Sequence, residues 1–211
     1  MGKIIKVGFT VCVHICILAA LGVAIFYIIF TPRDVRFHVT DAALTKFDLT
    51  ANNTLFFKLE LNMAIRNPNR RIGFYYDRFL AVASYRKKSI GAAKLGSFYQ
   101  GHKTTTFWKP VFEGSHFLTL SGKDLRKFEE EKSIGIYSVD VVIYLRVKAR
   151  FGKIKTDYYE PGKVKCHLKV PLSSYHSSSG FKTTKCKSHG FYTDHHYKIN
   201  DDYTYGTYPY G

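Results

Sequence analysis

Acidic residues are scarce in this chain of 211 residues. Asp and Glu together number 16 against 32 Lys and Arg, so the formal net charge is +16 at pH 7. A surplus of this sign favours polyanions as partners, whether nucleic acid, anionic lipid headgroups or acidic polysaccharide. Composition does not choose among the three. It does exclude wholesale disorder, because 45% of the residues are hydrophobic and 16% are aromatic.

Catalytic and nucleotide-binding motifs are also missing. The sequence has no His-Glu-x-x-His, no Cys-x-x-Cys and no strand-to-helix serine elbow, which argues against the commonest zinc, thiol and acyl-transfer enzymes. Gly96–Lys103 superficially resembles a phosphate-binding loop, but His102 displaces the lysine by one position and a Thr run follows instead of a helix. We therefore predict no enzyme, no catalytic residue, no cofactor and no metal site.

Charged residues are absent from Val7 to Phe30, a run of 24 residues. As a helix this run would span about 36 Å, enough to cross a hydrocarbon core of about 30 Å. It is longer than the apolar region of a cleaved signal peptide, which is about 7–15 residues. It is also apolar on all sides, unlike most core helices. We predict an uncleaved transmembrane helix over residues 7–30 that contacts the bilayer, preceded by a cytosolic stub, residues 1–6.

Charges that flank this segment leave its orientation nearly undecided. Lys3 and Lys6 on one side are balanced by Arg33 and Arg36 on the other. The sequon Asn52-Asn53-Thr54 can be glycosylated only in the secretory lumen. Together with the cysteine usage, the sequon predicts a cytosolic N-terminus and a C-terminal domain that is extracellular or luminal, with Asn52 as the glycosylation site.

Cysteines are few, four in all. Cys12 and Cys16 lie inside the apolar run, which leaves Cys166 and Cys186 as the one pair outside it. An isolated pair is consistent with one disulfide in an oxidising compartment. Closing that loop would contribute about 3 kcal/mol to stability. Two free buried thiols are the alternative.

Alternation of apolar and polar residues dominates the chain beyond the apolar run. It is clearest in Leu55–Ile65, Tyr137–Phe151 and Lys163–Leu172, where one face of each strand is expected to be buried and the other wet. A helical pattern is not convincing there, except for a turn around Asp124–Glu131. Shorter strand candidates are Val35–Thr40, Phe79–Tyr85, Ser89–Leu95 and Thr104–Phe112. Such a series of one-sided strands predicts an antiparallel β-sandwich and a mainly β protein.

Composition changes after Leu172. A Ser-rich connector covers residues 173–180, and the last residues are rich in Tyr, His and Gly with almost no aliphatic side chains. Such a segment cannot build a core. We therefore predict a β-sandwich domain over residues 31–190 and a disordered tail over residues 191–211.

Several blocks of the sequence resemble one family. Asn67–Asp77 (NPNRRIGFYYD), Phe98–Lys103 (FYQGHK), Lys165–Leu172, Thr184–Cys186 and Phe37–Ala42 stand in the order and spacing of the plant NDR/HIN-like proteins. This family (abbreviated NHL) comprises the non-race-specific-disease-resistance-like and hairpin-induced-like proteins. The resemblance covers about residues 32–187.

The resemblance implies a late-embryogenesis-abundant group-two domain with a fibronectin- or immunoglobulin-like sandwich fold. It also implies a plasma-membrane protein of pathogen defence whose domain faces the cell wall, with no enzymatic activity or cofactor. Asn67-Pro68-Asn69 is interpreted first as a turn, since proline presets φ and Asn side chains satisfy backbone groups, and second as a recognition loop. The candidate motif and recognition residues are Asn67, Pro68, Asn69, Tyr75, Tyr76, Asp77, Tyr99, Gln100, Gly101 and His102.

The leading hypothesis is a non-enzymatic membrane protein that presents a basic sandwich to acidic cell-wall polysaccharide. The alternative is a lipid-contacting or membrane-tethering module that acts on anionic bilayers. A third possibility is a scaffold for membrane receptor proteins, contacted through the transmembrane helix and Asn67–Asp77. Nucleic acid is not expected as a partner, because the domain is anchored and faces outward.

Overall fold

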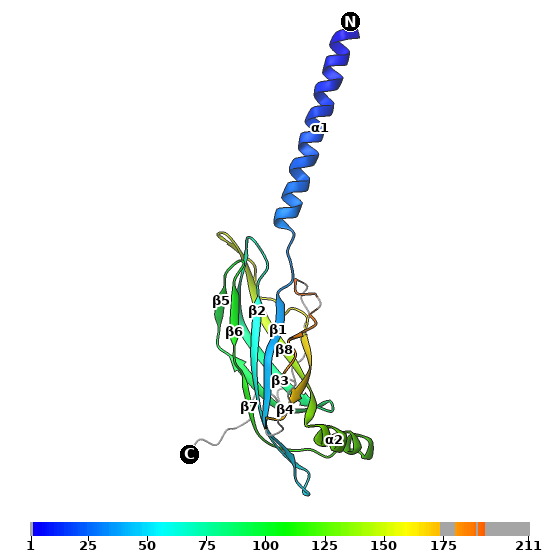
Figure 1. Cartoon of the computed structure of the whole chain (residues 1–211). Helices are drawn as coiled ribbons and strands as arrows, with labels where there is room; N and C mark the ends of the chain where they lie inside the picture. The colour runs from blue at the N-terminus through cyan, green and yellow to red at the C-terminus, as the bar shows by residue number, and fades with distance from the viewer. Residues whose placement is uncertain (1, 174–179, 189, 193–211) are drawn as a thin grey trace. The chain divides into compact units, whose positions relative to one another are not determined.

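The chain contains one long N-terminal helix and one β-rich domain in the computed structural model, which describes residues 2–173, 180–188 and 190–192 (Figure 1). Helix α1 (Gly2–Phe30) confirms the predicted helix. Its segment Val7–Tyr27 is long and apolar enough to cross a membrane by length and composition. The backbone N–H and the hydroxyl of Thr31 both donate to the carbonyl of Tyr27. The helix does not continue beyond them because Pro32 has no N–H to donate to the next carbonyl.

Two antiparallel sheets make up the domain, as predicted. The first has five strands in the order β11-β1-β2-β6, with β7 also paired to β2. The second has six strands in the order β10-β8-β3-β4, with β5 on β3 and β9 on β8. The strands are β1 (Arg36–Leu49), β2 (Thr54–Arg66), β3 (Ile72–Tyr85), β4 (Lys88–Leu95), β5 (Phe98–Gln100), β6 (Thr105–Trp108), β7 (Val111–Phe117), β8 (Ile136–Phe151), β9 (Ile154–Lys155), β10 (Val164–Pro171) and β11 (Thr184–Lys185).

The hydrophobic core lies between the two sheets, because every long strand buries alternate side chains. Along β8 the buried and partly exposed positions alternate almost without interruption. Burying one such Leu, Val or Phe side chain contributes about 1.5–3 kcal/mol. One end of the core is aromatic: Phe47 packs on Tyr85, Phe128 and Tyr137, with ring centroids 4.5–6.2 Å away.

Helix α2 (Gly122–Ile134) occupies the region where the sequence indicated only a turn around Asp124–Glu131. The expectation failed because the helix buries one residue, Phe128, while Leu125 and Ile134 remain exposed. A single anchor gives no i, i+3, i+4 apolar pattern. The helix ends at Gly135, whose φ of 73° is the left-handed conformation that favours glycine, and its N–H donates to the carbonyl of Glu131 at 2.8 Å.

Three strand predictions needed correction. Strand β3 begins at Ile72 rather than at Phe79, so the second half of Asn67–Asp77 is strand. Strand β1 extends to Leu49 rather than Thr40, because bulges at Val39/Asp41 and Leu44/Lys46 interrupt the alternation. The segment expected as one strand over Thr104–Phe112 is two, β6 and β7, which both pair with β2. Pro110 separates them, since proline has no N–H to donate to a ladder.

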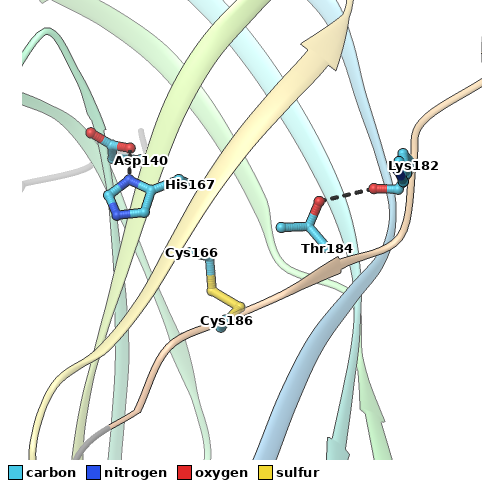
Figure 2. Close-up of a disulfide and its surroundings, with 6 residues drawn as sticks. All are labelled: Asp140, Cys166, His167, Lys182, Thr184 and Cys186. Atoms are coloured by element: carbon cyan, nitrogen blue, oxygen red, sulfur yellow. Dashed lines mark hydrogen bonds and ion pairs between the residues drawn. A yellow bond between two sulfur atoms is a disulfide. The ribbon is translucent and has the colours of Figure 1, made fainter.

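A C-terminal segment crosses from one sheet to the other and is held by a disulfide. Strand β11 pairs with β1 of the first sheet. The backbone of Lys187 forms an isolated antiparallel β-bridge with that of Lys165 on β10, in the second sheet. The predicted disulfide is present, joining Cys166 of β10 to Cys186 directly after β11 (Figure 2). Because it connects the second sheet to a segment paired with the first, the disulfide ties the two sheets together at this edge.

The domain also extends past its predicted boundary at residue 190. Phe191 is fully buried, and its ring lies 5.1 Å from that of Phe74, while Tyr192 is half-buried beside it. Both residues therefore belong to the folded domain and not to the predicted tail. The remaining residues of that tail, 193–211, and most of the Ser-rich connector, 174–179, lie outside the described residues.

Replacing Cys166 and Cys186 together by Ala should lower the free energy of unfolding by about 3 kcal/mol, because a loop closed over 20 residues no longer restricts the unfolded chain. The measurement is urea unfolding of the full chain in detergent, followed by the fluorescence of the single tryptophan, Trp108, which is buried. Dithiothreitol should reproduce the loss in the native protein. A Cys12→Ser/Cys16→Ser variant is the control, and equal urea midpoints for oxidised and reduced native protein would contradict the expectation.

Candidate functional site

The Asn-Pro-Asn turn is an interior structure. Asn67 is completely buried, and its side-chain amide donates to the carbonyls of Ile72 at 2.7 Å and Gly101 at 2.9 Å. Its oxygen accepts from the backbone N–H of Asn69 and from the side-chain amide of Asn69, both at 3.0 Å. One side chain therefore uses two donors and two acceptor positions, the full capacity of an amide. The side-chain amide of Asn69 also donates to the hydroxyl of Tyr192 at 2.9 Å.

Gln100, in the second sequence block (Phe98–Lys103), is another buried side-chain amide. Its amide nitrogen donates to the carbonyl of Ile65 at 2.7 Å and to the hydroxyl of Thr106 at 3.1 Å. Its oxygen accepts from the hydroxyl of Tyr76 at 3.2 Å. Burial raises the pKa of Tyr76 well above its usual value, so this phenol remains a neutral donor.

Four of the predicted recognition residues, Asn67, Asn69, Tyr76 and Gln100, are thus buried. A partner cannot contact them from solvent, and the turn interpretation of Asn67–Asn69 describes the structure. Pro68 is half-buried in the same turn, and the carbonyl of Gly101 accepts bonds from Asn67 and from the Thr104 hydroxyl. These residues build the domain.

Tyr75 and Tyr99 face the other way, onto the outer surface of the second sheet. They are direct cross-strand neighbours on β3 and β5, with ring centroids 4.5 Å apart. The ring of Tyr99 lies over Gly73, where a Cβ atom would stand 2.2 Å from the tyrosine oxygen. Glycine at this position therefore leaves the space in which Tyr99 rests flat on the sheet.

Cations from β8 and β9 cover these rings. The Arg150 guanidinium donates to the Tyr75 hydroxyl at 3.2 Å and lies 5.9 Å from the Tyr99 ring. The ammonium of Lys155 lies 5.2 Å above the ring of Tyr75. Such cation–π contacts contribute about 0.5–1 kcal/mol each at exposed sites. They hold the charged groups close to the sheet in defined positions.

The same arrangement continues along β8. Lys148 and Arg146 lie 4.7 Å and 5.4 Å from the ring of Tyr158. Lys163 lies 5.0 Å from the ring of Tyr144. We call the whole set the cation–tyrosine face: Tyr75, Tyr99, Tyr144, Tyr158, Arg146, Lys148, Arg150, Lys155 and Lys163. It combines five cations with four aromatic rings on one side of one sheet.

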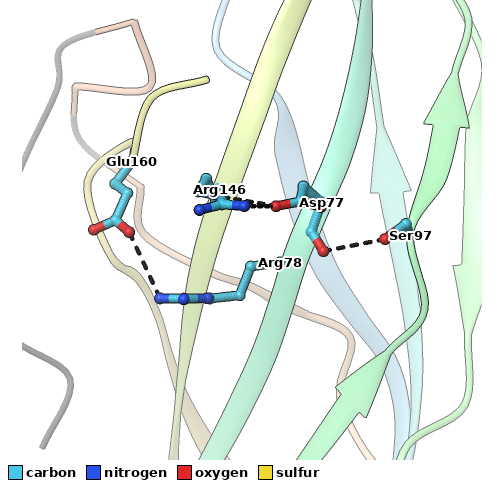
Figure 3. A network of polar contacts seen from close by, with 5 residues as sticks. All are labelled: Asp77, Arg78, Ser97, Arg146 and Glu160. Atoms are coloured by element: carbon cyan, nitrogen blue, oxygen red, sulfur yellow. Dashed lines mark hydrogen bonds and ion pairs between the residues drawn. The ribbon is translucent and has the colours of Figure 1, made fainter. Parts of the chain in front are cut away.

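Acidic groups on this side neutralise part of the charge. Asp77, the last residue of the first sequence block, accepts from the Nε of Arg146 at 2.7 Å, and its backbone carbonyl accepts from Ser97 (Figure 3). Arg78 pairs with Glu160 at 3.7 Å. Asp77 is thus a structural partner that fixes Arg146 on the sheet.

The remaining candidates are exposed. Asn52 lies in the turn between β1 and β2, where Asn53 has a positive φ of 57° and Thr54 begins β2. His102 is exposed in the connection from β5 to β6. His167 on β10 pairs with Asp140 at 2.6 Å (Figure 2). Within the described residues, no three His, Cys, Asp or Glu side chains gather as metal ligands.

Comparison with known proteins decides the family. No family model matches the chain. NDR1/HIN1-like protein 3 of Arabidopsis thaliana is 40% identical over 185 residues, which cover 86% of this chain and 79% of that protein. NDR1/HIN1-like protein 10 of the same plant is 42% identical over 176 residues, 82% of this chain and 76% of that protein. The chain belongs to the NDR1/HIN1-like family.

Membership confirms the resemblance stated from the sequence blocks. It makes the chain a relative of plant defence proteins, and the apolar helix α1 is compatible with a membrane anchor. A solved structure of a protein from Archaeoglobus fulgidus covers 64% of this chain and 98% of its own at 8% identity. Its TM-score of 0.30 is too low to support an argument.

Much of the face of this NDR1/HIN1-like protein escaped prediction. Alternation placed Arg146, Lys148 and Arg150 on the wet side of β8, and Lys163 on the wet side of the strand predicted over Lys163–Leu172. Tyr158 lies in a segment without regular alternation. Pairing with Arg146, Lys148 and Tyr144 depends on which strands and loops are neighbours. The available signal was the series of cations at every second position of one strand.

Asn67→Asp should destabilise this NDR1/HIN1-like domain by about 3 kcal/mol near pH 7, because a buried carboxylate cannot donate to the carbonyls of Ile72 and Gly101. Burial raises the pKa of the new carboxyl above the unfolded value of about 3.9. The loss should therefore grow as pH rises above that value and shrink toward pH 4, where the protonated group donates one bond. Urea unfolding at several pH values, read by Trp108 fluorescence, measures it.

Asn62→Asp is the matched control, since this amide is only partly buried and contacts Asp41 at 3.3 Å on the exposed side of β2. The change in the free energy of unfolding should be much smaller than the loss expected for Asn67→Asp. Equal effects at the two positions, or a loss at Asn67 that does not depend on pH, would contradict the role assigned to Asn67.

Proposed function

We propose that this chain is a non-enzymatic, single-pass plasma-membrane protein of plant defence whose extracellular domain binds acidic polysaccharide of the cell wall. The cation–tyrosine face carries the proposal. It supplies five positively charged groups fixed along one sheet, of which Arg146 is paired with Asp77, together with tyrosine rings and hydroxyls. Acidic polysaccharides carry repeated carboxylates and hydroxyls on rings, which such groups can pair with and hydrogen-bond.

Binding of this kind is the sum of many weak contacts. Exposed ion pairs contribute about 0–1 kcal/mol each and are screened by salt. A row of cations held by aromatic rings loses less side-chain freedom on binding than free lysines would, because part of that freedom is already lost. The face is therefore suited to a long polymer that contacts several cations at once, with an affinity that falls as salt rises.

The location outside the cell rests on two further observations. A disulfide joins Cys166 and Cys186, and such bonds persist in oxidising compartments. The sequon residue Asn52 is exposed at a turn, where glycosylation has access. With α1 as the membrane anchor, both support a cytosolic N-terminus and an extracellular C-terminal domain.

The alternative function is a module that contacts or tethers a second, anionic bilayer. Helix α2 favours it, because Lys123, Arg126 and Lys127 are exposed on the helix together with Leu125. Basic residues beside an exposed aliphatic side chain are typical of helices that lie on membrane surfaces. Flotation with liposomes that contain anionic lipid separates this function from polysaccharide binding.

Co-sedimentation of the detergent-solubilised full chain with polygalacturonate tests the proposal. Replacing Lys148, Lys155 and Lys163 by Gln should weaken binding about tenfold, the equivalent of three contacts of about 0.5 kcal/mol. About 0.5 M salt should release the native protein, since the Debye length falls below 5 Å. The matched control replaces Lys123, Arg126 and Lys127 by Gln, which removes the same charge from α2.

Equal loss of binding in both triple variants would mean that net charge, and not the face, attracts the polymer. Binding that persists in high salt would contradict an electrostatic mechanism. The alternative function would be favoured by two results together: the native protein floats with anionic liposomes whereas the α2 variant does not, and the native protein does not bind polygalacturonate.

Glycosylation of Asn52 tests the topology separately. Expression of the full chain in plant cells should give a protein whose mass falls on treatment with a glycan-releasing amidase, because the exposed turn is reached in the secretory lumen. Asn52→Gln and Thr54→Ala should each abolish the shift. A shift that persists in both variants would exclude Asn52 as the acceptor.

A further inference from the structure

The end of the domain at which the chain enters from the anchor is built from four segments. Strand β1 begins there, with Arg36 paired to Arg66 at the end of β2. The turn Asn67–Arg71 follows, and the backbone N–H of Lys103 donates to the carbonyl of Asn69 at 3.0 Å. The hairpin between β8 and β9 lies at the same end, because Ile72 at the start of β3 pairs with Phe151. We call this region the linker end.

Positive charge is concentrated at the linker end. Its described segments, residues 34–36, 66–71, 101–105 and 150–155, contain a single acidic residue, Asp34. Six exposed cations outside the cation–tyrosine face form what we call the basic crown: Arg36, Arg66, Arg70, Arg71, Lys103 and Lys153. Partial burial, Lys185 and Arg36 together lower the pKa of His38, which agrees with a positive potential near this end.

An exposed isoleucine stands within these charges. Ile154 is 74% exposed at the turn of the β8–β9 hairpin, between Lys153 and Lys155. Gly152, with a φ of 56°, makes the tight turn that projects it. An aliphatic side chain next to Lys153 suits the boundary between lipid headgroups and acyl chains, where the lysine stem lies along apolar surface and its ammonium group reaches phosphates.

Chain connectivity keeps this end near a membrane. Helix α1 ends at Phe30, and Val35 is the first fully buried residue of the domain. The five peptide units between them can span at most about 18 Å when fully extended. A tether this short gives the linker end a high effective concentration at the surface of the bilayer that holds α1, so even weak attraction is sufficient for binding.

We propose that the basic crown, with Ile154 inserted at its edge, docks on the phosphate headgroups of the membrane in which α1 is anchored. The occupant is the anchoring membrane and not a second bilayer or a soluble polyanion, because the tether presents this surface to it and the isoleucine has no use in binding a polysaccharide. The proposal rests on the proposed role of α1 as the membrane anchor. It does not rest on wall binding, since none of the six crown residues belongs to the cation–tyrosine face, although Lys155 of that face directly follows Ile154.

Docking would set the orientation of the domain. The turn between β1 and β2, with Asn52, lies at the opposite end of the sandwich from Arg36. Strand β1 has 14 residues, and a strand of that length spans about 45 Å. With the linker end on the bilayer, the cation–tyrosine face would stand beside the long axis of the domain and remain accessible from the side.

Hydrogen exchange of the full chain in lipid nanodiscs tests the docking. One sample contains phosphatidylcholine alone and the other adds phosphatidylglycerol. Amides in Gly152–Ile154 and Asn69–Arg71 should exchange about tenfold more slowly with phosphatidylglycerol at low salt, as expected when a bound state about ten times as populated as the free state protects them. High salt should remove the difference.

Three variants make the test specific. Arg70→Gln/Lys103→Gln/Lys153→Gln should abolish the lipid dependence, and Ile154→Ser should reduce it. Lys123→Gln/Arg126→Gln/Lys127→Gln, which removes the same charge from the other end, should retain it. Trp108 fluorescence confirms that each variant is folded. Equal exchange in the two lipids, or equal loss in the crown and α2 variants, would overturn the proposal.

Discussion

The side-chain amide of Asn67 is the contact on which the rest of the domain depends. The chain crosses from the first sheet to the second between β2 and β3, and it crosses back between β5 and β6. Asn67 bonds to Ile72 on the first crossing and to Gly101 on the second, so both connections are fixed to each other at one point. Buried backbone groups must find partners, and at a crossing no ladder supplies them. This explains how two sequence blocks about 30 residues apart form one structural unit.

The same unit sets the outer surface, because neighbouring residues of β3 and β5 point to opposite sides. Gln100 and Tyr76 point inward and bond to each other, while Tyr99 and Tyr75 point outward and pack against each other. Fixing the register inside therefore fixes the position of the tyrosine pair outside. Gly73 belongs to this arrangement, since only its missing side chain allows Tyr99 to lie against β3. The outward tyrosine pair and the inward hydrogen-bond network therefore both depend on the short pairing of β3 with β5.

Regular alternation made the long strands predictable, because burial on one face is a local property of β2, β8 and β10. Local pattern fails where the physical cause is distant. Bulges in β1 shift its buried positions, and α2 needs one buried residue, Phe128, supplied with neighbours by Phe47, Tyr85 and Tyr137. The turn at Asn67 could be predicted from the sequence, because its turn chemistry is local. Its bond to Gly101 could not, because Gly101 is distant along the chain. For the cation–tyrosine face, the sequence located the cations of β8, whereas their aromatic partners come from other strands and loops.

The strong net charge of the chain is divided into surfaces with different surroundings. On the cation–tyrosine face each cation lies against a ring, which restrains it and leaves hydroxyls beside it. At the linker end the cations surround an exposed isoleucine and a short tether, with a single acidic residue among the described segments. On α2 the basic residues are offset by Asp124 and by the run Glu129-Glu130-Glu131, so the helix as a whole is closer to neutral. A uniform excess of lysine and arginine would attract any polyanion equally well. If both proposals hold, division into a restrained face and a tethered crown would let one domain contact its own membrane and a separate acidic polymer at the same time, because the six crown residues are distinct from those of the face.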